Sequence, residues 1–168
     1  LYQVAVGALN PGDVTYPLRR WAADDRSHLA SFRRATVTGI DFAAKQVLVS
    51  RGDPIGYDKL IVCPGVGANF FGVPGAAEHT KQIYTRAQAL EVRDIIFSGL
   101  ELMAAERDPD KRFCAVVVGG GPTGVETAGA LAEMKTQALP ALYPEIGVDN
   151  FHVVLVEMTD RLLGPFNR

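Results

Sequence analysis

Hydrophobic runs and helical spacings alternate along the second half of the chain. Residues 113–118 are apolar without interruption, which predicts a buried strand. Residues 151–157 predict a second strand that ends on an acid, Glu157. Between the strands, small residues recur every four positions and would give a helix a smooth face to press onto a sheet. These small residues are Gly124, Ala128 and Ala132. The order of strand, glycine turn, helix and strand predicts a βαβ unit over residues 113–157.

A longer helix is predicted before the first of these strands. From residue 86 to about 107, apolar residues are spaced three and four apart, as on one face of a helix. They are Ala89, Val92, Ile96, Leu100 and Met103. Thr85 is a suitable N-cap, and the Asp108-Pro109-Asp110 turn would end the helix.

The first half of the chain carries shorter elements. Pro17 would begin a helix that runs to about Ala23. Strand signals follow at residues 35–40, 45–50 and 57–63. The last of these contains Leu60-Ile61-Val62-Cys63, which is too apolar for a half-exposed strand and predicts a buried one. Glycines and prolines between residues 64 and 75 then predict a hinge at a domain boundary.

The pattern as a whole predicts an α/β protein in two parts, residues 1–78 and residues 79–168. The composition is that of an ordinary globular protein, with 48% hydrophobic and 21% charged residues among 168. A net charge of −2 gives no reason to expect nucleic acid or an anionic membrane surface as a partner. No apolar run is long enough to span a bilayer.

The glycine turn after residue 118 indicates a nucleotide-binding site. Gly119 would allow a tight turn, Gly121 would let the backbone approach a pyrophosphate, and Gly124 would let the helix lie close to the strand. The helix N-terminus would add free N–H groups and the positive end of its dipole. The alternative is a structural turn in some other α/β domain.

Glu157 fits the same site from the end of the next strand. A carboxylate there can accept both ribose hydroxyls of an adenosine and repel a 2′-phosphate, which favours NAD over NADP. Glu157 follows Gly124 by 33 residues (157 − 124), more than the usual spacing of about 20. We attribute the excess to residues 137–149, where Pro140, Pro144 and Gly147 would break the helix.

Other candidate chemistry is weak. Cys63 and Cys114 both fall in apolar runs, which predicts buried, reduced thiols. His28, His79 and His152 share no metal-like spacing with one another or with the cysteines, so no metal site is predicted. No serine, histidine and acid arrangement suggests a hydrolase, and the closely spaced cysteine pair of a disulfide reductase is absent from the sequence.

Three stretches, in this order, resemble type II NADH dehydrogenases. They are Leu1-Tyr2-Gln3-Val4-Ala5, Tyr57-Asp58-Lys59-Leu60-Ile61-Val62-Cys63-Pro64-Gly65 and Gly119-Gly120-Gly121-Pro122-Thr123-Gly124-Val125-Glu126. That family comprises flavin-dependent NADH:quinone oxidoreductases of the pyridine nucleotide-disulfide oxidoreductase superfamily. The resemblance covers nearly the whole chain but only the middle of such a protein. Because the chain also starts at Leu1 without a methionine, we expect it to be an internal fragment.

The resemblance implies a Rossmann-like, two-dinucleotide-binding-domain flavoprotein fold that is incomplete here. Residues 1–78 would be the later part of an FAD domain, and residues 79–168 the beginning of an NADH domain. The residues implied to bind NADH are Gly119, Gly121, Pro122, Thr123, Gly124 and Glu157. Those implied to bind FAD are Leu1, Tyr2, Val37, Cys63, Pro64 and Gly65.

The implied contacts with FAD differ in kind. Leu1 and Tyr2 would lie beside the isoalloxazine, and Val37 would reach the adenine through main-chain groups. Pro64 stands where the family has threonine, which removes a hydroxyl and an N–H and puts any hydrogen bond from that position in doubt. Gly65 would still let the backbone approach the flavin.

Glu126 has two interpretations. A carboxylate in the first turn of a helix is favoured by the helix dipole alone. The resemblance implies instead that Glu126 faces the nicotinamide and the flavin, as a catalytic residue that orients the ring or relays a proton.

The resemblance implies a flavoprotein oxidoreductase that passes hydride from NADH to FAD and electrons on to a membrane quinone. The parent protein would be peripheral at the cytoplasmic face of the bacterial inner membrane, with its quinone contacts outside this fragment, and a homodimer is compatible with it. The fragment alone is expected to be inactive. The alternatives are a related FAD/NAD(P)H reductase with another acceptor, such as a ferredoxin-type protein, and a non-catalytic nucleotide-binding module.

Overall fold

The structure is a computed structural model that describes residues 1–25 and 29–166. It divides into two compact units, one made of Leu1–Val14 with Gly67–Arg168 and the other of Thr15–Val66. Leu1–Val14 therefore packs with the second half of the chain. The expected division of the parent protein at residues 78 and 79 stays a prediction.

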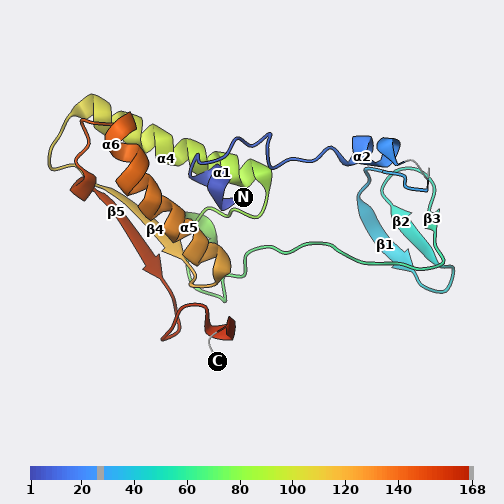
Figure 1. Cartoon of the computed structure of the whole chain (residues 1–168). Coiled ribbons are helices and arrows are strands. Elements are labelled where there is room, and N and C mark those ends of the chain that lie inside the picture. The colour runs from blue at the N-terminus through green and yellow to red at the C-terminus, as the bar shows by residue number, and fades with distance from the viewer. Residues whose placement is uncertain (26–28, 167–168) are drawn as a thin grey trace. The chain divides into compact units, whose positions relative to one another are not determined.

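The first unit contains a two-stranded parallel sheet with helices on one face (Figure 1). Its strands are β4 (Phe113–Val118) and β5 (Phe151–Val156), paired in register from Phe113 with Phe151 to Val118 with Val156. Its helices are α1 (Tyr2–Ala5), α3 (Ala76–His79), α4 (Arg86–Glu106), α5 (Pro122–Glu133) and α6 (Leu139–Leu142). A π-helical stretch at Met134–Ala138 and 3₁₀ turns at Val148–Asn150 and Gly164–Phe166 complete the unit.

Helix α4 forms as the sequence predicts. Thr85 Oγ1 accepts a hydrogen bond from Gln88 N at 3.2 Å, and Gln88 Oε1 accepts one from Thr85 N at 3.0 Å, which makes a reciprocal cap. Of the five residues on its predicted apolar face, four are buried and Val92 is partly buried. Arg107 ends the helix in the left-handed conformation, with φ of +53°, just before the predicted Asp108-Pro109-Asp110 turn.

The core lies between α4, α5 and one face of the sheet. Odd-numbered strand residues such as Phe113 and Phe151 face the helices, and their rings stack with centroids 5.1 Å apart. The core residues from the helices are Ile96, Leu100, Met103, Leu131, Met134 and Leu139. Tyr143, at the end of α6, donates a hydrogen bond to Glu101 Oε1 at 2.7 Å. Burial, reinforced by Glu101, raises the pKa of Tyr143 to about 12.

The expectation that residues 113–118 are buried on both faces is wrong. Val116, Val118, Val154 and Val156 point away from the helices and are between 43% and 62% exposed. A strand run this apolar needs cover on both faces, and the described residues supply helices on only one.

Both cysteines depart from the expected burial. Cys114 lies on the uncovered face of β4, and Cys63 lies in the other unit; both are free and exposed. Their apolar neighbours in the sequence predicted burial, but a side chain is buried only where another element packs on it.

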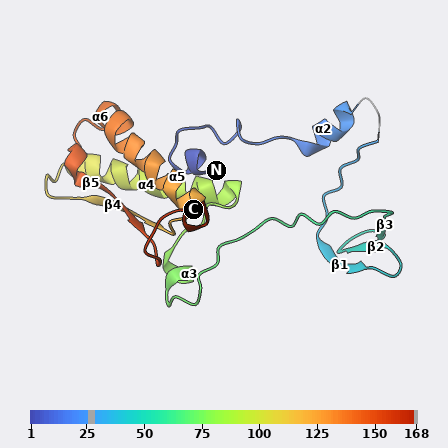
Figure 2. The same cartoon turned by 60° about the horizontal axis from the view of Figure 1, so that its bottom comes forward.

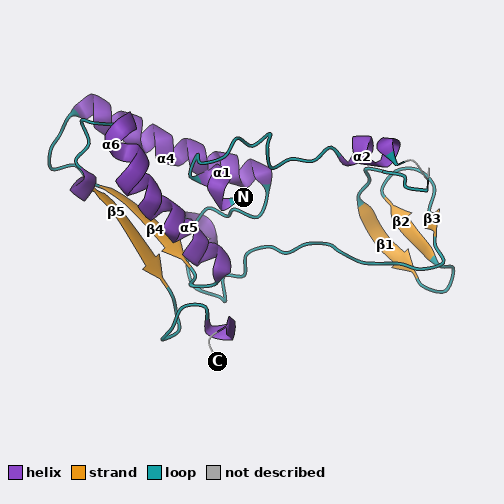
Figure 3. Ribbon diagram, viewed as in Figure 1, coloured by secondary structure: helices purple, strands orange, loops and turns teal. Residues whose placement is uncertain are grey.

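The second unit holds helix α2 (Leu18–Asp24) and a three-stranded antiparallel sheet (Figure 3). The strands are β1 (Val37–Asp41), β2 (Gln46–Val49) and β3 (Ile55–Gly56). The expected buried strand at 57–63 is wrong, because Ile61 and Val62 are 86% and 62% exposed and that segment carries no strand. The third strand is the shorter β3, whose Ile55 pairs with Val47 of β2.

The helix breaks within residues 137–149 as expected, since α6 ends at Leu142 just before Pro144, but Pro140 does not break it. Helical structure runs on from α5 through the π-helical stretch into α6, and Pro140 lies in the first turn of α6. Proline is tolerated in a first turn, and a π-helical stretch can take up a mismatch in the hydrogen-bond ladder. Ala132, expected on the sheet-facing side, is exposed, and Thr127 and Leu131 are buried instead.

Candidate nucleotide-binding site

The glycine turn connects β4 to α5, and within it Gly119 and Gly124 approach each other closely, as the sequence predicts. Gly119 has φ of +105°, a conformation that L side chains rarely adopt. A Cβ built on Gly124 would lie 1.8 Å from the carbonyl oxygen of Gly119, so only glycine fits there. The start of α5 therefore packs directly on the end of β4.

Free backbone donors face solvent at this turn. Gly121 is the N-cap of α5 and Pro122 its first residue. Gly121, Pro122 and Thr123 are exposed. Among the described residues, the N–H groups of Gly121, Thr123 and Gly124 have no acceptor. An anion placed there would meet free N–H groups at the positive end of the helix dipole.

Glu157 lies at the mouth of the same turn. It directly follows β5, and its Oε2 accepts a hydrogen bond of 2.5 Å from Gly120 N. Its Oε1 accepts a second, of 2.9 Å, from Thr159 N. A carboxylate has about four lone-pair sites, so each oxygen can still accept a further hydrogen bond. The acid predicted 33 residues beyond the motif is thus held beside it.

These backbone donors keep Glu157 charged. The N–H of Gly120, followed by that of Thr159, holds the pKa of Glu157 below its usual value. A lowered pKa means that the hydrogen bonds add to stability above the usual pKa of a glutamate. That contribution is lost as the pH falls through the lowered pKa. Near neutral pH the site therefore presents a full negative charge.

Sequence reasoning missed three residues of the site. Gly120 is buried, its N–H bonds Glu157, and its carbonyl oxygen accepts a 2.8 Å hydrogen bond from Leu163 N. A Cβ built on Gly120 would lie 2.6 Å from Leu162 Cδ2, so that side chain rests on the turn. Figure 2 shows the segment after β5 turning back toward the start of α5. The one available signal was the run Gly119-Gly120-Gly121, in which the motif leaves the middle glycine without a role.

Glu126 is the fifth residue of α5 and is exposed. It therefore lies in the second turn, and the interpretation as a first-turn carboxylate favoured by the dipole is wrong, because α5 begins at Pro122. Within the described residues its carboxylate has no hydrogen-bond or ion-pair partner. The carboxylate of Glu126 is therefore open to solvent on α5.

The residues implied to bind FAD are divided between the two units. Val37, Cys63, Pro64 and Gly65 belong to the unit Thr15–Val66. Gly65 has φ of +76° and open space where a Cβ would point.

Leu1 and Tyr2 belong with the glycine turn and precede the buried Val4 and Ala5, which pack beside Ala89 of α4. The structure brings together the residues from Gly119 to Gly124 with Glu157. The arrangement of the FAD residues around a ligand stays a prediction.

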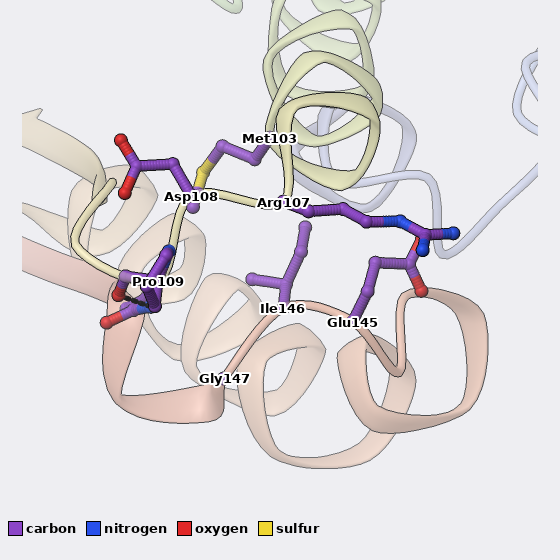
Figure 4. A pocket seen from close by; sticks show the side chains of 8 residues that line it. Met103, Arg107, Asp108, Pro109, Glu145, Ile146 and Gly147 are labelled. Carbon is purple, nitrogen blue, oxygen red and sulfur yellow. Dashed lines mark hydrogen bonds between the residues drawn. The ribbon is translucent and has the colours of Figure 1, made fainter.

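A hollow of about 230 Å³ lies at the other end of the strands (Figure 4). It is lined by Met103, Arg107, Asp108, Pro109, Glu145, Ile146, Gly147 and Asn150. Asn150 Nδ2 donates to the carbonyl oxygen of Pro109 at 2.9 Å across the loops that lead into β4 and β5. Six-residue strands put this hollow about 17–20 Å from the glycine turn, so it is not part of the nucleotide site.

Two further findings concern metals and membranes. Among residues 1–25 and 29–166, no group of three or more histidine, cysteine, aspartate or glutamate side chains is arranged to hold a metal ion. His28 lies outside the described residues. Within the described helices, none is both long and apolar enough to cross a bilayer.

Comparison with known proteins identifies the family. The family model described as pyridine nucleotide-disulphide oxidoreductase matches residues 12–168. The chain belongs to this family. The superfamily expected from the sequence and its dinucleotide-binding fold are thereby confirmed.

Within the pyridine nucleotide-disulphide oxidoreductase family, the chain is similar to type II NADH:quinone oxidoreductases. It is 33% identical over 171 residues to Ndh of Mycobacterium tuberculosis, covering 98% of this chain and 36% of that protein. It is also 33% identical over 170 residues to the type II NADH:quinone oxidoreductase of Staphylococcus aureus, covering 99% of this chain and 40% of that protein. The chain thus spans between 36% and 40% of the length of these curated relatives.

Among solved structures, the fold matches NDH2 from Plasmodium falciparum in complex with NADH. The TM-score is 0.80 at 21% sequence identity, and the match covers 99% of this chain and 35% of that one. At 21% identity, this match shows similarity of fold alone.

Proposed function

We propose that the chain is the central part of a type II NADH dehydrogenase, which oxidises NADH through FAD and reduces a membrane quinone. The observation that carries the proposal is the hydrogen bond of 2.5 Å between Gly120 N and Glu157 Oε2. It holds an ionised acid at the mouth of an exposed glycine turn. The similarity to type II NADH:quinone oxidoreductases supports the choice of acceptor.

The residues present fit NADH. The pyrophosphate would accept hydrogen bonds from the free N–H groups of Gly121, Thr123 and Gly124. The adenosine ribose hydroxyls would donate to the remaining lone pairs of Glu157. A 2′-phosphate would place negative charge against that carboxylate, so NADH is preferred to NADPH.

FAD would be held in part by Gly65, whose left-handed backbone and open Cβ direction let the main chain pass close to a planar ligand. Val37, Cys63 and Pro64 belong to the same compact unit as Gly65, and we assign them to FAD binding as well. We also assign Leu1 and Tyr2 to FAD binding. When bound, FAD supplies the two-electron acceptor for the hydride of NADH.

The protein contributes positioning to the chemical step. Hydride transfer requires donor and acceptor atoms about 3.5 Å apart, so residues that orient the nicotinamide set the rate. Glu126 lies on the same helix, two to five residues beyond the N–H groups assigned to the pyrophosphate (126 − 124 and 126 − 121). We assign it to the nicotinamide end of NADH, where its free carboxylate orients the ring or relays a proton.

Electrons would leave through parts of the protein that this chain does not include. We propose that the parent protein is peripheral at the cytoplasmic face of the bacterial inner membrane. We further propose that it forms a homodimer. The similarity to the NADH:quinone oxidoreductases of Mycobacterium tuberculosis and Staphylococcus aureus supports quinone as the acceptor.

The test is anaerobic flavin reduction in the full-length protein. NADH is expected to bleach the flavin absorbance, and a soluble quinone to restore it faster than a ferredoxin-type acceptor does. Glu126→Gln is expected to slow flavin reduction by about 100-fold or more, as for loss of one positioned acid–base group, while FAD stays bound. Stopped-flow absorbance measures both steps.

Glu133→Gln is the matched control. Glu133 is also exposed on α5 and lies seven residues, about two turns, after Glu126. Its replacement should leave the rate of flavin reduction unchanged. Equal rates in Glu126→Gln and in the wild type would contradict the assignment of Glu126, and a flavin that NADH does not reduce would contradict the function.

A further inference from the structure

The end of β5 and the segment after it hold the glycine turn at three backbone positions. Gly119 N donates to the carbonyl oxygen of Val156 at 2.8 Å, and Gly120 N donates to Glu157 Oε2 at 2.5 Å. Leu163 N donates to the carbonyl oxygen of Gly120 at 2.8 Å. Both polar backbone groups of Gly120 are therefore engaged before any ligand binds.

Leu162 covers the same glycine. A Cβ on Gly120 would lie 2.6 Å from Leu162 Cδ2 and 3.0 Å from Glu157 Oε2, so the leucine and the acid meet at one point. Leu162 is 44% exposed. Part of its side chain therefore contacts Gly120, and the rest faces solvent. Its apolar atoms thus lie beside the hydrogen bond between Gly120 and Glu157.

Leu163 adopts an unusual backbone conformation to complete the arrangement. Its φ is +52°, which leucine seldom adopts. The chain turns there, and the N–H of Leu163 reaches the carbonyl oxygen of Gly120. Phe166 N then donates to the carbonyl oxygen of Leu163 at 2.8 Å, which continues the turn.

We propose that Leu162 and Leu163 form a clamp that fixes Gly120 and Glu157 in the conformation that receives NADH. Leu162 is then a positioning residue, which acts on the nucleotide through Gly120 and Glu157. This inference rests on the proposed function, because it assumes that NADH binds at the glycine turn. Loosening the clamp frees Glu157 and the turn to move, so NADH must order them on binding and binds more weakly.

The first test compares Leu162→Ala with Leu142→Ala in the full-length protein loaded with FAD. Leu142 is 62% exposed at the end of α6 and gives the same chemical change away from the turn. Leu162→Ala is expected to raise the dissociation constant of NADH by about tenfold, with the limiting rate of flavin reduction unchanged. Leu142→Ala and the conservative Leu162→Met should behave as the wild type. Stopped-flow flavin reduction at varied NADH separates binding from the rate.

The second test is a double substitution. Gly120→Ala places a methyl group 2.6 Å from Leu162 Cδ2 and 3.0 Å from Glu157 Oε2, so these side chains must shift, and NADH binding is expected to weaken by about tenfold. If the two positions acted independently, the losses of Gly120→Ala and Leu162→Ala would multiply. The clamp predicts instead that Gly120→Ala with Leu162→Ala binds NADH more tightly than Gly120→Ala alone, because the nearer of the two colliding side chains is gone.

The outcomes distinguish the clamp from the function on which it rests. A wild-type flavin that NADH does not reduce would overturn the proposed function and the clamp together. Wild-type reduction by NADH, with Leu162→Ala matching Leu142→Ala, would overturn the clamp alone. Losses of NADH affinity that multiply when Gly120→Ala is combined with Leu162→Ala would also overturn the clamp.

Discussion

Replacing Gly124 with alanine is expected to abolish NADH-dependent flavin reduction in the full-length protein. It should also lower the free energy of unfolding by about 3 kcal/mol. The added Cβ would lie 1.8 Å from the carbonyl oxygen of Gly119. That atom belongs to the backbone of the glycine turn, so no side-chain rotation relieves the collision. The helix must move away from β4, and the N–H groups assigned to the pyrophosphate move with it.

Gly129→Ala is the control for this substitution. Gly129 lies in the same helix, and a Cβ there would meet nothing within 4 Å. Because alanine is the better helix former, Gly129→Ala should raise stability by up to about 1 kcal/mol and leave NADH binding unchanged. Chemical denaturation measures the first effect and stopped-flow flavin reduction the second. Similar NADH kinetics in the two variants would refute the importance of the close contact at Gly124.

Glu157→Gln is expected to lower the preference for NADH over NADPH by about 10- to 100-fold, the value of one or two hydrogen bonds to a charged group. Glutamine offers one oxygen and one NH₂ group, so it cannot accept from Gly120, from Thr159 and from two ribose hydroxyls at once. It also removes the charge that repels a 2′-phosphate. NADH binding should therefore weaken while NADPH binding holds or improves.

Asp160→Asn makes the same change of charge three residues further on. Asp160 is exposed, and its side chain makes no hydrogen bond to the glycine turn among the described residues, so its replacement should leave the ratio of NADH to NADPH affinity near the wild-type value. Titration of both nucleotides against the two variants gives the ratios. If Asp160→Asn shifted the ratio as much as Glu157→Gln, general electrostatics rather than Glu157 would account for the preference.

Local signals in the sequence predicted the parts of the fold that depend on local interactions. The cap of α4 at Thr85 and Gln88 and the apolar face of that helix follow from residues three and four apart. The positive φ of Gly119 and the close approach at Gly124 follow from the glycine spacing. These elements could be assigned because their partners are near in sequence.

Features that depend on distant partners could not be assigned in the same way. The burial of residues 113–118 and of Cys63 depends on which elements cover them, and the described helices cover one face of β4 only. Helical structure continues past Pro140 because a π-helical stretch precedes it, which the proline itself does not reveal. The contact of Leu162 with Gly120 joins residues 42 positions apart (162 − 120), with no motif to indicate it.

The most direct test of the central claim is a crystal structure of the full-length protein with NADH. The account predicts pyrophosphate oxygens on the N–H groups of Gly121 and Thr123, and both adenosine ribose hydroxyls within about 2.6–3.2 Å of the Glu157 carboxylate. NADH bound with its pyrophosphate away from the glycine turn, or with its adenosine ribose out of reach of Glu157, would contradict it.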